Sequence, residues 1–306
     1  MERYLQIYKG DCLKKKYIKK YQRVLVFDLD ETLGSFFDLH LLWCGIKKIR
    51  KKQPENEQNE FNSILDLYPE FLRYGILNIL DFLYLKKKQN ECDKIYVYTN
   101  NICNPPWVTL ITNYFNYKLK TKDELFDKVI CAFKINHKIL EISRTTKEKT
   151  YNDFINCTLL PKSTEICFLD NTYYNEMRNE KVYYIQPRAY IHILTIQTII
   201  DRFIYSNVLS QMETIFSTVT HVPNTKMEKI EEFLYDWFSI HSTDNKHRTN
   251  LEVDVFVAQK MMYHIKEFFY LTNRKNKTKK NKLRLTKTTR KMRNNMHPDE
   301  QSPNAI

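Results

Sequence analysis

Between residues 23 and 187, short apolar runs alternate with longer amphipathic stretches. A short apolar run bounded by polar residues is typical of a strand covered on both faces, whereas apolar residues at helical spacing predict a helix. The predicted strands are 23–27, 94–101, 127–133, 165–171 and 181–187. The predicted helices are 76–88, 105–119 and 146–155, and the polar stretch 51–62 is predicted to be a surface loop.

This alternation predicts an α/β fold, a Rossmann-like three-layer arrangement around a mostly parallel sheet with a small cap or none. In such a sheet, ligands bind beyond the carboxyl ends of the strands. Polar residues lie at the carboxyl ends of three of the predicted strands: Asp28 and Asp30, Thr99 and Asn100, and Asp170 and Asn171. The sequence therefore predicts a polar site at this edge of the sheet.

Beyond about residue 188 the pattern becomes helical. The stretch 189–205 predicts a buried amphipathic helix, and two further helices are predicted to pack on the body through one apolar face, although such a face could also bind a partner. Those two faces consist of Ile230, Phe233, Leu234, Trp237 and Phe238, and of Val257, Met261, Ile265 and Phe268. We divide the chain into an N-terminal extension (1–21), the α/β domain (22–190), a C-terminal helical extension (191–271) and a basic disordered tail (272–306).

The positive charge of the chain is concentrated in one short segment. The net charge is +13, but residues 274–293 contain eleven of the 49 lysines and arginines and no acidic residue. The remaining 38 basic residues nearly balance the 36 acidic ones, so the rest of the chain is close to neutral. Solvated disorder is the simplest interpretation of residues 274–293, and phosphate contacts with a nucleic acid are the alternative.

Cysteine and glycine usage excludes several kinds of site. The seven cysteines form no CxxC pair, which argues against a disulfide framework and a structural zinc site. The four glycines form no phosphate-binding glycine loop and no GxSxG motif. No signal peptide and no apolar run of about 18 residues is visible, so we expect a cytoplasmic or nuclear protein without a membrane partner.

Asp28, Asp30 and Thr32 form a DxDxT motif directly after an apolar strand. Two carboxylates at this position repel each other unless a cation is present, and oxygen ligands suit Mg²⁺. One of the two acids can attack as a nucleophile while the other transfers protons. A simpler alternative is that Asp28 only caps the turn, just as Thr99, Lys149 and Asp170 would each be unremarkable alone.

Taken together, these segments resemble the haloacid dehalogenase superfamily of phosphotransferases. The segment VFDLDETL (26–33), a strand ending in Thr99, a lysine and then LDN (169–171) resemble in particular the branch that dephosphorylates the C-terminal domain of RNA polymerase II, also called NLI-interacting-factor-like phosphatases. FLRYGILNILDFL (71–83) resembles the start of a helix in that branch, with Tyr74 where proline is usual. YTNN (98–101) departs from the usual TAS but keeps Thr99.

The resemblance implies a role for each residue of the site. Asp28 is expected to attack phosphorus and form an aspartyl-phosphate, and Asp30 to act as the general acid and base. Thr99 is expected to bind phosphoryl oxygens, and Lys149, preferred over Lys147, to neutralise their charge. The expected cofactor is Mg²⁺, and its ligands are Asp28, the carbonyl of Asp30, and Asp170 or Asn171.

The short connections leave little room for a large cap, because only 66 residues separate Thr32 from Thr99. In the resembled superfamily an uncapped site goes with macromolecular substrates, so a phosphorylated protein serine or threonine is the first expectation. A phosphatase of nucleic-acid ends or nucleotides is the second. A third hypothesis is a non-catalytic scaffold that binds nucleic acid or protein through the tail and the C-terminal helices.

Overall fold

The computed structural model describes residues 4–14, 21–50, 54–101, 105–216, 223–242 and 250–293. Over these residues the main sheet has six strands in the order β1-β8-β7-β2-β3-β4. The strands are β1 (Leu5–Lys9), β2 (Arg23–Phe27), β3 (Lys94–Tyr98), β4 (Lys128–Ile130), β7 (Glu165–Leu169) and β8 (Val182–Pro187). All neighbours pair in parallel except β1, which is antiparallel to β8. The α/β fold with a mostly parallel sheet is therefore confirmed.

The central strands β2 and β7 are buried along their full length, as their continuous apolar sequences predict. Alternate residues of β2 belong to two different clusters: Leu25 and Phe27 pack into the larger core on one face, and Val24 and Val26 into a smaller one on the other. Both faces of the sheet are therefore covered, which forms the three layers.

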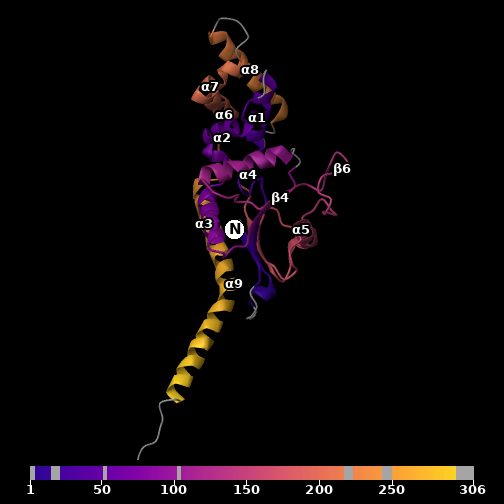
Figure 1. Cartoon of the computed structure of the whole chain (residues 1–306). Helices are drawn as coiled ribbons and strands as arrows, with labels where there is room; N and C mark the ends of the chain where they lie inside the picture. The colour runs from indigo at the N-terminus through magenta and orange to yellow at the C-terminus, as the bar shows by residue number, and fades with distance from the viewer. Residues whose placement is uncertain are drawn as a thin grey trace, which may run out of the picture.

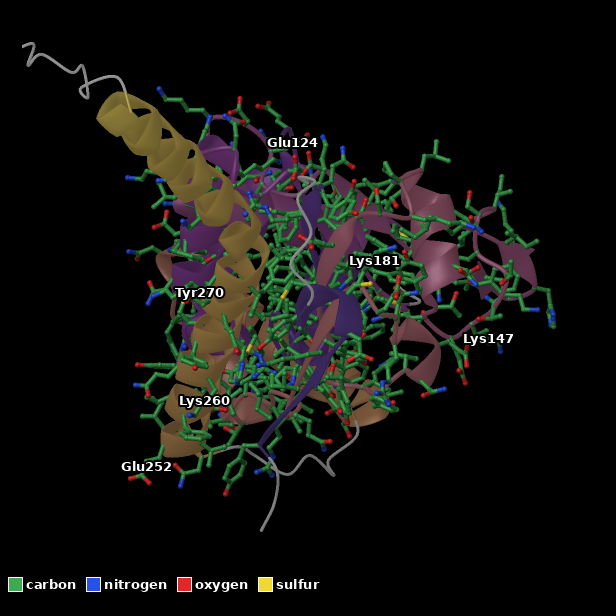
Figure 2. The ribbon with its side chains drawn as sticks, turned by 90° about the horizontal axis from the view of Figure 1, so that it is seen from below. Glu124, Lys147, Lys181, Glu252, Lys260 and Tyr270 are labelled. Carbon is green, nitrogen blue, oxygen red and sulfur yellow. The ribbon has the colours of Figure 1, made fainter. Side chains whose placement is uncertain are left out.

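Helices cover the two faces unequally (Figure 1). The larger core receives α3 (Ile76–Lys88), α4 (Pro105–Leu119) and α9 (Leu251–Arg293), whereas α5 (Tyr151–Thr158) packs on the opposite face. Figure 2 shows α9 along one side of the sheet, with Lys260 and Tyr270 on it, and Lys147 on the far side near α5.

A second group of helices lies at one end of the molecule (Figure 1). It comprises α1 (Phe37–Ile49), α2 (Glu57–Asp66), α6 (Ile196–Ile204), α7 (Asn207–Phe216) and α8 (Pro223–His241). Helix α8 packs against α1 and α6, and α2 packs against α4. Leu39, Phe61 and Leu234 belong to the same core cluster as the sheet, so this group continues the main core rather than forming a separate one.

The surface loop expected at 51–62 is wrong in part, because α2 begins at Glu57. Asn56 caps this helix by accepting a hydrogen bond from the backbone N–H of Asn59 at 3.0 Å. Phe61, Ile64 and Leu65 are fully buried on its inner face. Polar residues on the outer face concealed this amphipathic helix in the sequence.

Three other boundaries differ from the expectation. Helix α5 begins at Tyr151 rather than at 146, because the Thr150 side chain caps it by accepting from the N–H of Asp153. The strand expected at 127–133 ends at Ile130 and is followed by a hairpin of β5 (Lys134–Ile135) and β6 (Lys138–Ile139). Only the second half of the helix expected at 189–205 is helical, as α6. Short 3-10 turns complete the described elements: η1 (Asp11–Lys14), η2 (Pro69–Phe71) and η3 (Asn175–Met177).

Two of the domain limits also change. The N-terminal extension contributes β1 to the sheet. The segment expected to be a disordered tail from residue 272 continues α9 as far as Arg293, consistent with the good helix propensity of lysine and arginine and the lack of glycine and proline in 251–293. Residues 294–306 of the tail lie outside the described residues.

The apolar face expected in the last helix is confirmed by burial, whereas Phe233 and Trp237 of the preceding helix are only partly buried. Val257, Met261, Ile265 and Phe268 are all at most 1% exposed and face the sheet, where α9 contacts β7 and β8. Among the described residues, no helix combines the length and apolarity that crossing a membrane requires.

Candidate active site

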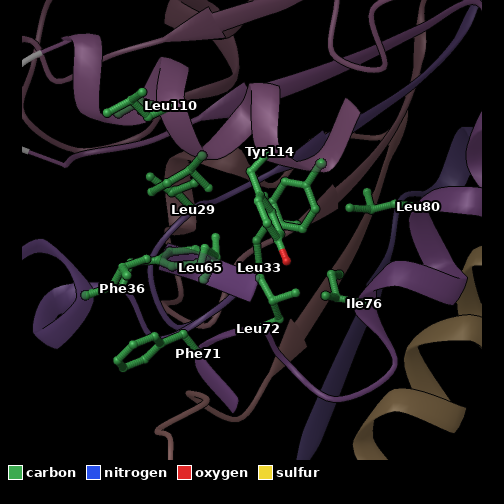
Figure 3. Packing of buried hydrophobic residues seen from close by; sticks show 14 of the residues in the cluster. Leu29, Leu33, Phe36, Leu65, Phe71, Leu72, Ile76, Leu80, Leu110 and Tyr114 are labelled. Atoms are coloured by element: carbon green, nitrogen blue, oxygen red, sulfur yellow. The ribbon is translucent and has the colours of Figure 1, made fainter. Parts of the chain in front are cut away.

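The loop after β2 directs its carboxylates away from the core. Leu29 and Leu33 are fully buried in the larger core, where they pack near Phe36, Leu65 and Leu72 (Figure 3). The acidic residues alternate with these leucines and therefore point elsewhere. The backbone N–H of Asp28 donates to the carbonyl of Leu169 at 2.8 Å, which joins the end of β2 to the end of β7.

Arg73 fixes the backbone of this loop by hydrogen bonds. Its guanidinium donates to the carbonyl oxygens of Thr32 at 2.6 Å, of Glu31, and of Arg188 at 2.8 Å. Arg73 is 3% exposed, and burial lowers its pKa to about 10, so it stays charged at neutral pH. Arg73 lies in the segment 71–83 that carries part of the resemblance, but its role was not predicted from the sequence.

Lys149 connects the ends of two neighbouring strands. Its Nζ lies 2.5 Å from Oδ1 of Asp28 and 2.6 Å from Oδ2 of Asp170. The Lys149 and Asp170 side chains are each 1% exposed and that of Asp28 is 10% exposed. Lys147 is exposed at the surface (Figure 2), so the structure brings Lys149, and not Lys147, to the two aspartates.

The charges in this cluster do not balance. Burial by itself lowers the pKa of Lys149, but Asp170 and Asp28 raise it more, so that its pKa lies above the ordinary value and the ammonium is retained. Burial, together with the charge of Asp28, raises the pKa of Asp170 although Lys149 opposes this. One buried ammonium thus faces two carboxylates. When both carboxylates are ionised, one negative charge is uncompensated, which favours the binding of a further cation.

Asp30 lies at the rim of the cluster. Its Oδ2 accepts a hydrogen bond of 2.5 Å from Nδ2 of Asn101, which follows β3. Burial, together with the charge of Asp28, raises the pKa of Asp30 to about 6, although the hydrogen bond from Asn101 opposes the rise. A carboxyl group with such a pKa can both donate and accept a proton near neutral pH.

Two predicted residues lie at the site but point to other partners. Thr99 is 1% exposed, and its hydroxyl accepts from the N–H of Asn101 at 2.9 Å. The Asn171 side chain accepts from the Thr32 hydroxyl at 3.0 Å and donates to Glu31 at 3.1 Å. Of the two alternative ligands, Asp170 therefore faces Asp28 through the shared ammonium, whereas Asn171 is turned toward the loop that carries Thr32.

Two residues at the site, Arg144 and Tyr174, were missed by the sequence analysis. Arg144 is 2% exposed and donates to the carbonyl of Thr99 and to the side chain of Asn100. Asn100 in turn donates to the hydroxyl of Tyr174, whose ring lies 5.5 Å from Nζ of Lys149. No spacing pattern marks these residues, because each acts through a contact between distant loops.

The donor set fits Mg²⁺ better than a transition metal. In the described part of the chain, no three His, Cys, Asp or Glu side chains lie close enough together to hold a metal ion by themselves. Asp28 and Asp170 nevertheless offer two carboxylates in excess of one ammonium. Mg²⁺ is commonly bound by one or two carboxylates, with water and substrate phosphate completing its shell, so these residues fit that ion.

Comparison of the chain with protein-family models, with curated proteins and with solved structures found no match. The likeness to the haloacid dehalogenase phosphatases therefore stays a prediction from the motifs.

Proposed function

We propose that this protein is a Mg²⁺-dependent phosphatase that acts through an aspartyl-phosphate on Asp28. The observation that carries the proposal is the Lys149 ammonium held between Asp28 and Asp170 at the ends of neighbouring parallel strands. Asp30 lies two residues beyond Asp28, with a pKa near 6. A nucleophile, a proton donor and a buried cation are thus present together, as phosphoryl transfer requires.

In the first step, Asp28 is the attacking group. Its Oδ1 is engaged by Lys149, and among the described residues Oδ2 has no hydrogen-bond donor, so Oδ2 is the oxygen free to attack. A bond forms between Oδ2 and phosphorus while the bond from phosphorus to the ester oxygen breaks. Asp30 gives its proton to that departing oxygen.

In the second step, water attacks the phosphorus of the aspartyl-phosphate. Asp30, now ionised, takes a proton from that water, the acyl phosphate bond breaks, and inorganic phosphate leaves with Asp28 restored. Lys149 balances negative charge on the transferred group in both steps. When bound, Mg²⁺ would add positive charge beside Asp28 and Asp170 and so lower the repulsion between these carboxylates and a phosphate dianion.

The substrate proposed first is a phosphorylated serine or threonine of a protein. Within the described residues, the chain between β2 and β3 folds into α1, α2 and α3, whose buried residues join the main core. This segment therefore does not form a separate cap domain, and a site without one suits a macromolecular substrate. The eleven basic residues of 274–293 favour nucleic-acid ends or nucleotides as the second candidate.

A substrate screen tests the proposal. Phosphoserine, phosphothreonine and phosphotyrosine peptides and 3′- and 5′-phosphorylated oligonucleotides are incubated with the protein, with Mg²⁺ and with a chelator, and released phosphate is measured. We expect Mg²⁺-dependent release from the serine and threonine peptides and none from Asp28→Asn. Undiminished release under chelation, or by Asp28→Asn, contradicts the proposed chemistry. Release from oligonucleotides alone would favour the second candidate, and no release from any substrate would favour a non-catalytic scaffold.

A further inference from the structure

Arg144 is buried in the loop before α5, and its guanidinium has five acceptors. Nη1 donates to the carbonyl oxygens of Thr99 at 3.1 Å and Cys131 at 2.8 Å. Nη2 donates to Oδ1 of Asn100 at 2.7 Å and to the carbonyl oxygens of Lys147 at 3.0 Å and Glu148 at 3.2 Å. All but one of these acceptors are backbone carbonyls, so the contacts fix main-chain positions rather than side chains.

These acceptors belong to three separate segments of the chain. Thr99 and Asn100 follow β3, Cys131 follows β4, and residues 147–148 directly precede Lys149. A planar guanidinium presents five N–H donors in a fixed fork, whereas a lysine ammonium presents three from a single atom, so a lysine cannot reproduce these five contacts. Arg144 therefore ties the backbone just before Lys149 to the ends of two strands of the sheet.

The aromatic residues around Lys149 are part of the same arrangement. The ring of Tyr98 lies 4.9 Å from the Arg144 guanidinium and 5.8 Å from Nζ of Lys149. The Tyr98 hydroxyl also accepts from the N–H of Thr150 at 3.3 Å. On another side, Tyr174 lies over the ammonium and is held by Asn100, which Arg144 itself binds.

We propose that Arg144 is a positioning residue that fixes the ammonium of Lys149 between Asp28 and Asp170. Arg144 makes no contact with either carboxylate among the described residues, so it acts through Lys149 and Asn100. This inference rests on the proposed function for its effect on turnover, but the placement of Lys149 can be measured without turnover. A lysine side chain has four rotatable carbon–carbon bonds, and the position of its backbone decides whether Nζ reaches both oxygens.

The test compares Arg144→Gln and Arg144→Lys with Arg50→Gln as a matched control. Arg50 is another buried arginine, paired with Glu60 between α1 and α2. Two quantities are measured: the ¹H–¹⁵N resonance of the Lys149 ammonium, assigned by its loss in Lys149→Met, and the kcat and KM for an aryl phosphate. Both Arg144 variants should lose or shift the resonance and lower kcat by about 100-fold with little change in KM, the size of effect expected of a misplaced group. Arg50→Gln should leave the Lys149 resonance and kcat unchanged.

The remaining outcomes show whether Arg144 positions Lys149 or only stabilises the fold. An unchanged ammonium resonance in folded Arg144→Gln overturns the inference, and so does a full rescue of kcat by Arg144→Lys, because charge alone would then suffice. If both Arg144 variants fail to fold while Arg50→Gln folds, Arg144 serves global stability and the inference is wrong. Inactivity of the wild type toward every phosphate ester would contradict the proposed function, yet the resonance would still report on Arg144.

Discussion

Two buried charged clusters in the described part of the chain differ in their charge balance. Arg50, at the end of α1, pairs with Glu60 in the first turn of α2, and the two side chains are 2% and 9% exposed. This pair contains one cation and one anion and joins two neighbouring helices. At the carboxyl ends of β2 and β7, by contrast, one ammonium faces two carboxylates.

A balanced pair can serve structure alone, because each charge compensates the other. The cluster around Lys149 has an excess of negative charge, which lowers stability unless another cation joins it. A phosphate dianion approaching Asp28 would be repelled by the same excess. The imbalance therefore favours a site that is completed by a cation, whereas the charges of Arg50 and Glu60 already compensate each other.

Asp28→Asn is expected to have the largest effect. Asparagine keeps the shape of the side chain but cannot form the aspartyl-phosphate, so kcat for an aryl phosphate should fall by about 1,000-fold or more. The matched change Glu60→Gln should leave kcat within about two-fold, because Glu60 pairs with Arg50 between two helices and has no role in the proposed reaction. Initial rates are measured with circular-dichroism melting to confirm folding. A near-normal rate for Asp28→Asn would remove Asp28 as the nucleophile.

The second prediction compares the two clusters by stability. Lys149→Met leaves two buried carboxylates without their ammonium and should lower the free energy of unfolding by about 3–5 kcal/mol at pH 7. Arg50→Met leaves only one buried carboxylate without its partner, so it should lower the free energy of unfolding by a smaller amount. Burial already raises the pKa of Asp170 and of Glu60.

The sign of the pH dependence follows from those raised pKa values. In Lys149→Met the folded state holds its carboxyl protons at a higher pH than the unfolded state does. The free energy of unfolding of this variant should therefore rise as the pH falls from 7 to 5, relative to wild type. Urea denaturation at the two pH values measures it. If Lys149→Met and Arg50→Met lower the free energy of unfolding equally, and by the same amount at both pH values, the proposed difference between the two clusters is contradicted.

The protonation of Asp30 should have a smaller effect, which appears in the pH dependence of kcat/KM. Its pKa near 6 means that the protonated form needed to release an alkoxide is lost as the pH rises above 6. The kcat/KM for a phosphoserine peptide should therefore fall by about tenfold per pH unit above that value. A nitrophenyl phosphate, whose leaving group needs no proton, should show a flatter profile. Identical profiles for the two substrates would show that Asp30 is not the general acid.

The residues of the site that directly follow the parallel strands could be predicted from the sequence. The apolar runs of β2 and β7 end where Asp28 and Asp170 begin, so parallel pairing brings these two residues together. Lys149 was preferred over Lys147 because it starts KTYNDFI, which resembles the lysine-initiated helix of the phosphatase family, and its ammonium does lie at the two aspartates. Local pattern and topology were sufficient for Asp28 and Asp170, whereas Lys149 also required the resemblance to the phosphatase family.

Contacts between distant loops could not be predicted in this way. Arg144 and Thr99 are 45 residues apart, and their contact uses a backbone carbonyl that carries no sequence signal. Helix α2 was missed because its burial depends on packing against α4, which polar residues such as Glu57 and Glu60 concealed. The antiparallel pairing of β1 with β8 joins residues about 180 positions apart, so no local pattern in the N-terminal segment indicates it.

The last prediction concerns a third concentration of charge, which has the opposite balance to the cluster around Lys149. Residues 274–293 carry eleven positive charges and no negative one, whereas the rest of the chain has a net charge of +2. If these residues bind nucleic acid, they do so by phosphate contacts and counterion release, so binding should be nearly independent of sequence and should weaken steeply with salt. A truncation after Asn273 keeps the part of α9 that packs on the sheet, including Ile265 and Phe268, and should lose this binding while aryl-phosphate turnover stays within about two-fold of the full chain. Both proteins are compared in oligonucleotide binding at two salt concentrations and in turnover. Equal binding by both would show that the segment is a solvated extension without this role, and loss of turnover in a folded truncation would show that it contributes to the site around Asp28.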